Sequence, residues 1–310
     1  MEYELHGLCC TATSNPPCLS LSLSLPPISR NHFTEKGVVK LTRALEGNSS
    51  LKFLDLSRNA LGFQAVYELQ CACSASGLLI KTGGNHVFEE IMNAVSHAVG
   101  FIASVVGSTL LMTDAIAKGT DYHYWSAALF SFSLMFLFFS STLYHSFFML
   151  PSAAWILQIF DHVGIYFLIA GSYTPFMLIG LHHSSEARTL LAVEWLLAAF
   201  GAIYAASVDL SKPMTNVIEC TVFLTMGFGC ILVLPQMNES MPGECVNLLF
   251  VGGAAYALGI TFYVMGEYKP IFHVFWHCVV VLAAAIHWFA VYFYVMPMDL
   301  DRDLSMYSSS

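Results

Sequence analysis

FHVFWHC, residues 272–278, opens the last long apolar run of the chain, which extends over 271–295. A run of this length can cross a bilayer as one α-helix. His273 and His277 are four residues apart, so a helix places both imidazoles on one face, one turn apart. Ionisable groups inside a membrane segment are costly and indicate a functional site. Two imidazoles on one face can share a metal ion, although this spacing alone also occurs by chance in many helices.

The composition of the chain is that of an integral membrane protein. Of its 310 residues, 56% are hydrophobic and 11% are charged, whereas soluble domains contain about 25% charged residues. The net charge of −9 argues against nucleic acid as a partner. The nine cysteines are odd in number and form no CxxC pair, so we expect neither a disulfide framework nor a cysteine-based zinc site.

A series of apolar runs begins after residue 86, each near the roughly 20 residues that span a bilayer. Polar residues and prolines separate these runs, which are 92–113, 124–146, 159–181, 189–208, 216–235, 246–266 and 271–295. Backbone polar groups must be satisfied internally within lipid, which excludes open sheet edges there. We therefore predict an all-α fold, a seven-transmembrane-helix bundle over residues 86–296, followed by a C-terminal tail at 297–310.

The N-terminal extension has a different character. Residues 1–33 contain a low-complexity Leu/Ser alternation and are predicted to be a disordered tail. Within 34–80, the leucine-rich-repeat pattern L-x-x-L-x-L-x-x-N-x-L is matched by Leu51, Leu54, Leu56, Asn59 and Leu61. One such repeat cannot bury its own apolar face, since about three are needed. The fragment is therefore interpreted either as a remnant that contacts another protein or as an artefact of gene structure.

Several polar residues of the apolar runs fall at one membrane face. If there are seven spans, odd-numbered helices begin on the N-terminal side of the membrane and even-numbered helices end there. The residues at that face include Glu89, Glu90, Asn93, His97, Ser141, His145, Asp161, His273 and His277. Polar groups placed at random would not gather at one face across four helices, so we expect a shared site.

Three neutral imidazoles and one water form a tetrahedral zinc site of the catalytic kind. His145, His273 and His277 can supply the imidazoles. Asp161 is a candidate fourth ligand, or a base that holds the water at the metal. Ser141 lies one turn before His145 on the same helix face, where its hydroxyl can bond a substrate or that water.

Other interpretations of these residues stay open. His145 alone is compatible with an ordinary interfacial histidine, and Asp161 with a cap at the start of the third span. Glu90, Asn93 and His97 have the spacing of a hydrogen-bonded seam between helices.

Two further histidines have separate interpretations. His162 is the substitute ligand if one of the three is wrong. His287 lies 14 residues beyond His273, on nearly the same helix face but about 21 Å deeper. It is interpreted as a cavity-lining or helix-bonding residue.

The same residues carry a resemblance to the haemolysin III and progestin/adipoQ receptor family. The matching motifs are FEE at 88–90, SHAVG at 96–100, SSTLYH at 140–145, DHVGIY at 161–166, IAGSYTPF at 169–176, Gly252-Gly253, Tyr256, Gly259, Phe262-Tyr263, and the HxxxH with its trailing His287. The motifs occur in the same order as in the family and cover roughly residues 86–296. The set as a whole is far more specific than any single motif. The leucine-rich-repeat segment departs from the family pattern.

The resemblance implies a seven-helix bundle with an internal zinc ion near the cytosolic face. The implied ligands are the residues matching His145, His273 and His277, with Asp161 reaching the metal through water and Ser141 nearby. Similar membrane hydrolases include alkaline ceramidases, which implies amide hydrolysis of a lipid. Other relatives are described as hormone receptors, and the bacterial branch is described by haemolysis.

Three functions are therefore weighed. The first is a zinc-dependent lipid amidohydrolase acting on a ceramide-like membrane lipid. The second is a zinc-stabilised seven-helix signalling receptor without catalysis. The third is a pore, which is disfavoured because the polar groups cluster at one face and do not line a full path. An enzyme should keep an open coordination position, and a structural site should be closed by a fourth protein ligand.

The orientation in the membrane rests on a glycosylation sequon and on the resemblance. Lysine and arginine near the helix ends are too few to set it by the positive-inside rule. Asn238-Glu239-Ser240 is an N-glycosylation sequon between the fifth and sixth spans. This loop faces the lumen or exterior if the N-terminus is cytosolic, as the resemblance also implies. We expect a multi-pass membrane protein with a cytosolic N-terminus.

Overall fold

The computed structural model describes residues 40–43, 45, 53–56, 69, 79–82, 87–148, 150–210 and 212–300. The chain divides into two compact units, residues 1–84 and 85–310, and each is described by itself. The predicted disordered tail at 1–33 lies outside the described residues, as does the C-terminal tail beyond residue 300.

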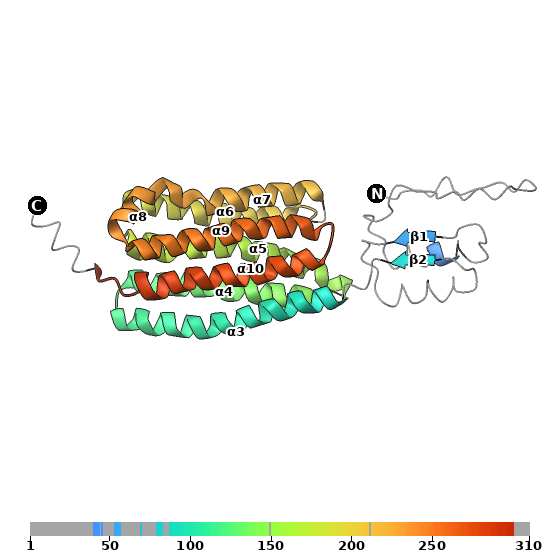
Figure 1. Ribbon diagram of the computed structural model, residues 1–310, viewed down its shortest axis with the longest axis horizontal. Coiled ribbons are helices and arrows are strands. Elements are labelled where there is room, and N and C mark those ends of the chain that lie inside the picture. Colours follow the sequence, from blue (N-terminus) through green and yellow to red (C-terminus); the bar gives the residue numbers. More distant parts are fainter. Residues whose placement is uncertain are drawn as a thin grey trace, which may run out of the picture. The chain divides into compact units, whose positions relative to one another are not determined.

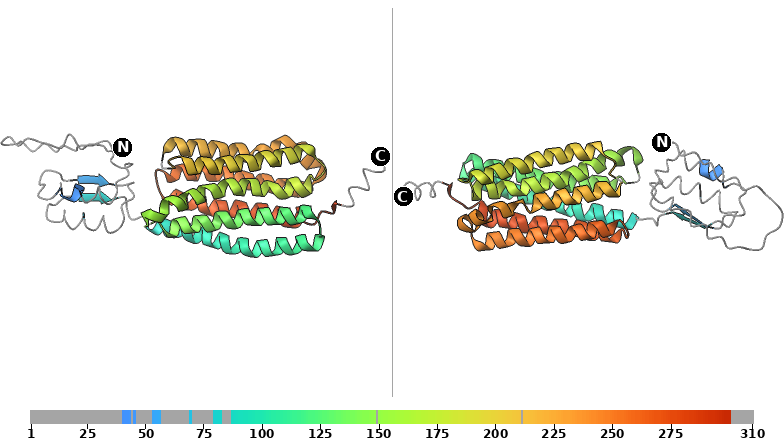
Figure 2. Two further views of the ribbon diagram at one scale, coloured as in Figure 1. Left: turned by 180° about the vertical axis from the view of Figure 1, so that it is seen from behind. Right: turned by 90° about the horizontal axis from the view of Figure 1, so that it is seen from above.

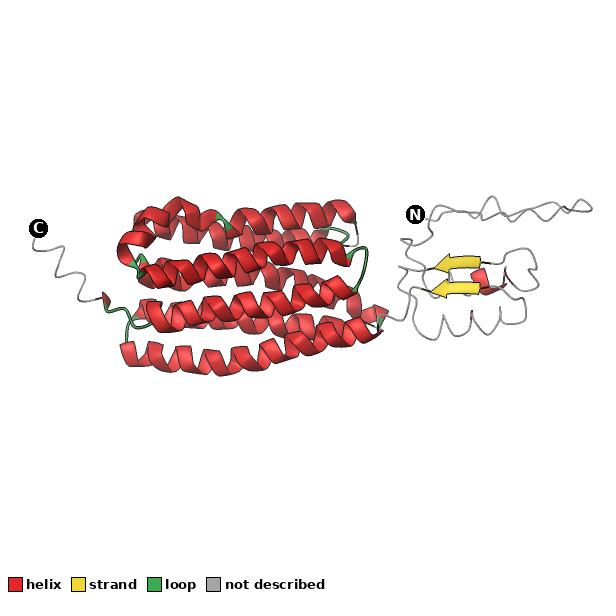
Figure 3. Ribbon diagram, viewed as in Figure 1, coloured by secondary structure: helices red, strands yellow, loops and turns green. Residues whose placement is uncertain are grey.

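The first unit contains two paired strands, β1 (Phe53–Leu56) and β2 (Leu79–Thr82), drawn as yellow arrows in Figure 3. The strands are parallel, and each residue of β1 pairs with the residue 26 positions later, as Phe53 does with Leu79. An offset of this size lies within the period of about 20–29 residues found in leucine-rich repeats. The leucine-rich-repeat pattern covers β1 but not β2. In β2, Thr82 stands at the position that pairs with Leu56, so the leucine of the pattern is absent there. The repeat itself stays a prediction, since Leu51, Asn59 and Leu61 lie outside the described residues.

The second unit is a helical bundle (Figure 1). Its helices have the bounds α3 (Val87–Lys118), α4 (Asp121–Ser146), α5 (Pro151–Pro175), α6 (Ser185–Ser207), α7 (Pro213–Gly227), α8 (Leu234–Ser240), α9 (Gly243–Gly266) and α10 (Ile271–Ala290). Short helical turns of other types extend three of them, namely η2 (Phe176–Gly180), η3 (Gly229–Val233) and η4 (Val291–Val295).

Helices that follow one another along the chain pack side by side. α3 packs against α4, α4 against α5, α5 against α6, and α9 against α10. α10 also packs against α3, so the last helix returns to the first and closes the bundle, as the two views of Figure 2 show. This closure brings the start of α10 beside the start of α3 and the end of α4.

The bundle has the properties of a membrane domain. Among the described residues, seven helical stretches are long and apolar enough to cross a membrane, which confirms the predicted fold class. Large apolar side chains such as Phe200, Ile102 and Leu232 are 66%, 65% and 76% exposed, an outward face suited to lipid. The fifth span runs over Met214–Ser240, five residues beyond the predicted end at 235. Pro235 did not stop it because proline fits the first turn of α8.

Two spans are irregular for identifiable reasons. The third changes to π-helical turns directly after Pro175, which has no backbone N–H to continue the α-helical ladder. The fifth is interrupted between α7 and α8. There the Tyr173 hydroxyl donates to the carbonyl of Met226, 2.7 Å away, and accepts from the amide of Cys230, 2.8 Å away. A side chain of α5 thus satisfies backbone groups that the helix break releases.

Gly164 lies where the backbones of α5 and α4 approach closely. A Cβ added there would lie 2.9 Å from the backbone Cα of Leu137, which cannot turn aside as a side chain can. We predict that Gly164→Ala lowers the free energy of unfolding by about 1–3 kcal/mol, measured by thermal denaturation in lipid nanodiscs. Gly253→Ala is the matched control, because nothing lies within 4 Å of its added Cβ. Equal stability of the two variants would contradict the close approach.

Candidate metal centre

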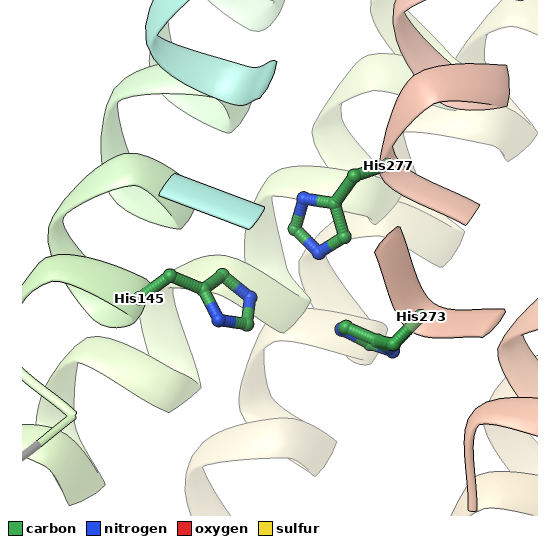
Figure 4. A group of neighbouring side chains, drawn as sticks. All are labelled: His145, His273 and His277. Carbon is green, nitrogen blue, oxygen red and sulfur yellow. The ribbon is translucent and has the colours of Figure 1, made fainter. Parts of the chain in front are cut away.

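Three buried or half-buried imidazoles converge inside the bundle. His145 comes from the last turn of α4, and His273 and His277 come from the first turns of α10. One ring nitrogen of each lies within 4.8 Å of the other two, so the group can hold a metal ion. Figure 4 shows the ring of His145 facing the two rings of α10 across a shared space. The structure therefore brings together the three residues predicted as ligands.

The spacing and chemistry of the group fit the predicted metal. Nitrogens around a tetrahedral zinc with bonds of about 2.0–2.1 Å are about 3.3 Å apart, somewhat closer than the 4.8 Å limit that encloses this group. Three nitrogen donors are a set that zinc accepts, and they leave one coordination position for another group.

Glu90 on α3 fixes the orientation of His145. Its Oε2 lies 2.6 Å from Nδ1 of His145, and the Asn93 amide lies 3.5 Å from the same nitrogen. With the Nδ1–H donated to the carboxylate, Nε2 of His145 keeps its lone pair for a metal. The spacing of Glu90 and Asn93 indicates a seam between helices, and the contact from Glu90 to His145 is such a seam, made to a predicted ligand. The Asn93 amide nitrogen is itself a donor, so it does not bond the protonated Nδ1.

Unpartnered polar atoms gather around this group. In the described part of the chain, the buried side-chain atoms near it without a hydrogen-bond partner are Asn93 Oδ1, His97 Nδ1 and Nε2, Ser141 Oγ, His145 Nε2 and His277 Nδ1. Buried polar groups in native proteins nearly always have a partner, and each exception needs an explanation. A metal held by the three histidines, together with further polar groups, would supply partners for these atoms.

Ser141 differs from the hydroxyl residues beside it. Ser140 and Thr142 donate to carbonyls of their own helix, those of Leu137 and Phe138, at 3.1 and 2.6 Å. Ser141 is fully buried, and its Oγ has no partner among the described residues. Its hydroxyl is therefore available to a bound group, and its role in binding a substrate or water stays a prediction.

Asp161 lies in α5, half-buried, near the three histidines but outside their group. Its carboxylate is within electrostatic reach of Tyr144 and Tyr263. The ring of Tyr144 lies 4.8 Å from that of His145, and the ring of Tyr263 lies 5.8 Å from that of His273. Asp161 is therefore not a member of the three-histidine group, and its predicted catalytic role stays a prediction.

His162 and His287 form hydrogen bonds outside the group of three histidines. His162, the substitute ligand, bonds Glu219 of α7 through Nδ1 at 2.7 Å. His287 bonds the carbonyl of Leu249 in α9 at 3.0 Å, so its interpretation as a helix-bonding residue is confirmed. Neither residue belongs to the group of three.

For His97 the seam interpretation stays a prediction. It is 2% exposed, yet neither ring nitrogen has a hydrogen-bond partner among the described residues. Its ring lies 3.9 Å from that of His277, measured between centroids. The spacing of His97 from Glu90 and Asn93 places all three residues on one face of α3. It does not identify what the ring of His97 contacts.

We predict that metal content follows the three imidazoles. His145→Ala and His277→Ala should each lower the bound divalent metal of the purified protein severalfold, because two imidazoles hold an ion far less tightly than three. Elemental mass spectrometry of detergent-purified protein measures this. The control is His287→Ala, which removes a buried histidine outside the group and should leave the metal content unchanged. Equal metal in all variants would contradict the site.

A second prediction concerns Glu90. Glu90→Gln should weaken metal affinity about 10–100-fold, because the amide no longer holds the imidazole of His145 as a carboxylate does. Competition with a chelator of known affinity measures the change. Glu89→Gln is the matched control on the same turn of α3. A loss of metal in the control equal to that in Glu90→Gln would speak against a specific contact.

Comparison with known proteins identifies relatives of the second unit. A family model described as "Haemolysin-III related" matches residues 85–288. "Hemolysin-3 homolog" of Bacillus subtilis (strain 168) is 35% identical over 206 residues, which is 66% of this chain and 94% of that protein. "Monocyte to macrophage differentiation factor" of Homo sapiens is 33% identical over 230 residues, 70% of this chain and 90% of that protein.

Proposed function

Because the chain belongs to the haemolysin-III related family of membrane proteins, we propose that its histidine centre holds zinc and hydrolyses the amide bond of a ceramide-like lipid. The observation that supports this most is the three-imidazole group with room for a further ligand. Zinc sites that serve catalysis have this composition. When bound there, zinc would supply a Lewis acid that polarises a carbonyl and acidifies water.

The competing hypothesis is a receptor in which zinc has only a structural role. A structural site is normally closed by a fourth protein ligand. Among the described histidine, cysteine, aspartate and glutamate residues, the group has three members, which favours the open site of an enzyme.

Asp161 is the proposed base. It accepts a proton from the attacking water, whose oxygen becomes bonded to the acyl carbon. The C–N bond then breaks, and Asp161 returns the proton to the departing nitrogen. The products are a fatty acid and an amine, and the aspartate ends in its starting state. Ser141 holds the water or the substrate through its unpartnered hydroxyl.

The position of the centre favours a lipid as the substrate. Its residues lie within helical stretches that are apolar enough to cross a membrane. The outer face of these helices carries large exposed apolar side chains, such as Ile102 on α3 and Leu282 on α10. A molecule that reaches such a site from the bilayer must itself be apolar over most of its length.

Asp161→Asn separates catalysis from metal binding. The amide keeps the shape of the side chain but cannot take a proton, so the variant should keep most of its zinc and lose turnover at least about 100-fold. Purified protein with a panel of ceramides, assayed for released amine beside a zinc measurement, provides the test. The matched comparison is His273→Ala, which should lose zinc and turnover together.

Two results would remove this mechanism. Turnover unchanged in Asp161→Asn would exclude the aspartate as the base. Absence of turnover with any lipid in zinc-loaded wild-type protein would favour the signalling receptor.

The proposed orientation places the N-terminus and the metal end in the cytosol and Asn238 on the opposite side. Asn238 is exposed in α8, at the end of the fifth span. A cysteine replacing Asn238 should be labelled by a membrane-impermeant maleimide in intact cells. Lys212→Cys is the matched variant at the other end of the same span, and it should be labelled only after permeabilisation. The reverse pattern would invert the orientation.

A further inference from the structure

His97 is a buried histidine whose function is not explained by packing. It lies on α3 with its ring between two neighbours, 3.9 Å from the ring of His277 and 5.1 Å from the ring of Phe138. An imidazole always carries at least one N–H donor, so leaving both nitrogens buried without a partner is unfavourable. Neither nitrogen of His97 has a partner among the described residues.

Three other buried histidines of the bundle do have partners. His145 bonds Glu90, His162 bonds Glu219, and His287 bonds the carbonyl of Leu249. His97 also lies outside the group whose ligand atoms are within 4.8 Å of one another. It is therefore placed beside His277 as an additional polar group, with ring nitrogens that a bound molecule can bond.

The position of His97 indicates which part of a molecule it meets. His277 lies one helical turn, about 6 Å, further into the membrane than His273. His97 contacts His277, so it flanks the deeper side of the centre. Directly beyond it lies the apolar ring of Phe138, which packs against both His97 and Gly100. A polar atom bound by His97 must therefore sit where an apolar chain begins.

We propose that His97 binds the acyl carbonyl of a lipid, donating an N–H to its oxygen while the acyl chain continues past Phe138. This rests on the proposed function and extends it by naming the residue that recognises the scissile carbonyl. During hydrolysis negative charge develops on that oxygen, and a preoriented donor stabilises it. His97 exchanges no proton in this role, and Asp161 remains the base.

Binding measurements on zinc-loaded protein test this without turnover. Asp161→Asn serves as the background so that bound lipid stays intact. The probes are a ceramide and its O-alkyl analogue, in which an ether methylene replaces the carbonyl. Competition against a fluorescent ceramide in nanodiscs should give about tenfold tighter binding of the ceramide, as expected for one well-formed hydrogen bond.

The variant His97→Phe keeps the volume of the ring and removes the donor. It should keep its zinc and bind the two probes within about twofold of each other. His97→Gln, which retains an N–H, should recover part of the preference. His123→Phe is the control, since His123 is a buried histidine at the start of α4, the opposite end of that helix from His145. If His97→Phe does not fold, His97→Leu replaces it.

The outcomes separate this inference from the proposed function. Loss of zinc in folded His97→Phe would make His97 a ligand and overturn the proposal, as would an unchanged preference for ceramide. Absence of preference in the parent protein would overturn it too, even if wild-type protein hydrolyses ceramide. A preference that depends on His97 in a protein without turnover would support the recognition site and reject the hydrolase.

Discussion

The hydrogen bond from His145 to Glu90 is the interaction on which the centre depends. In an apolar bundle both groups are costly alone, and pairing them satisfies each. The pairing also selects the tautomer of His145, since donating from Nδ1 leaves Nε2 facing the two histidines of α10. A single contact between α3 and α4 thus decides which nitrogen a metal can use.

Sequence spacing predicted much of this site, for physical reasons. Helical periodicity fixes which residues of one helix share a face, so His273 and His277 were paired correctly, and topology placed His145 at the same membrane end. Spacing says nothing about how one helix is rotated against another. The bond from Glu90 to His145 and the pairing of His162 with Glu219 therefore needed the structure. The strand β2 was missed because Ile80 and Thr82 stand at the positions that pair with Leu54 and Leu56 of β1.

The family match and the metal centre are both confined to the second unit. Residues 85–288 match the family model, and the Bacillus subtilis relative is covered over 94% of its length by about two thirds of this chain. The three histidines of the metal group lie together at one end of α4 and α10, and irregular helical turns follow Pro175 and the break near Met226. A small polar centre against an apolar wall suits a molecule with one polar group and a long chain, more than it suits a continuous aqueous path.

The face of α3 that carries Glu90, Asn93 and His97 has a consequence for biosynthesis. It contacts His145 of α4 and His277 of α10, so it joins the earliest helices of the bundle to the last. Chains are made from the N-terminus, and α10 is the final helix to leave the ribosome. Before α10 is made, the polar groups of α3 and α4 at this site can bond only to one another. The three-histidine group is therefore completed last, and capture of a metal would mark a chain whose helices have all been inserted.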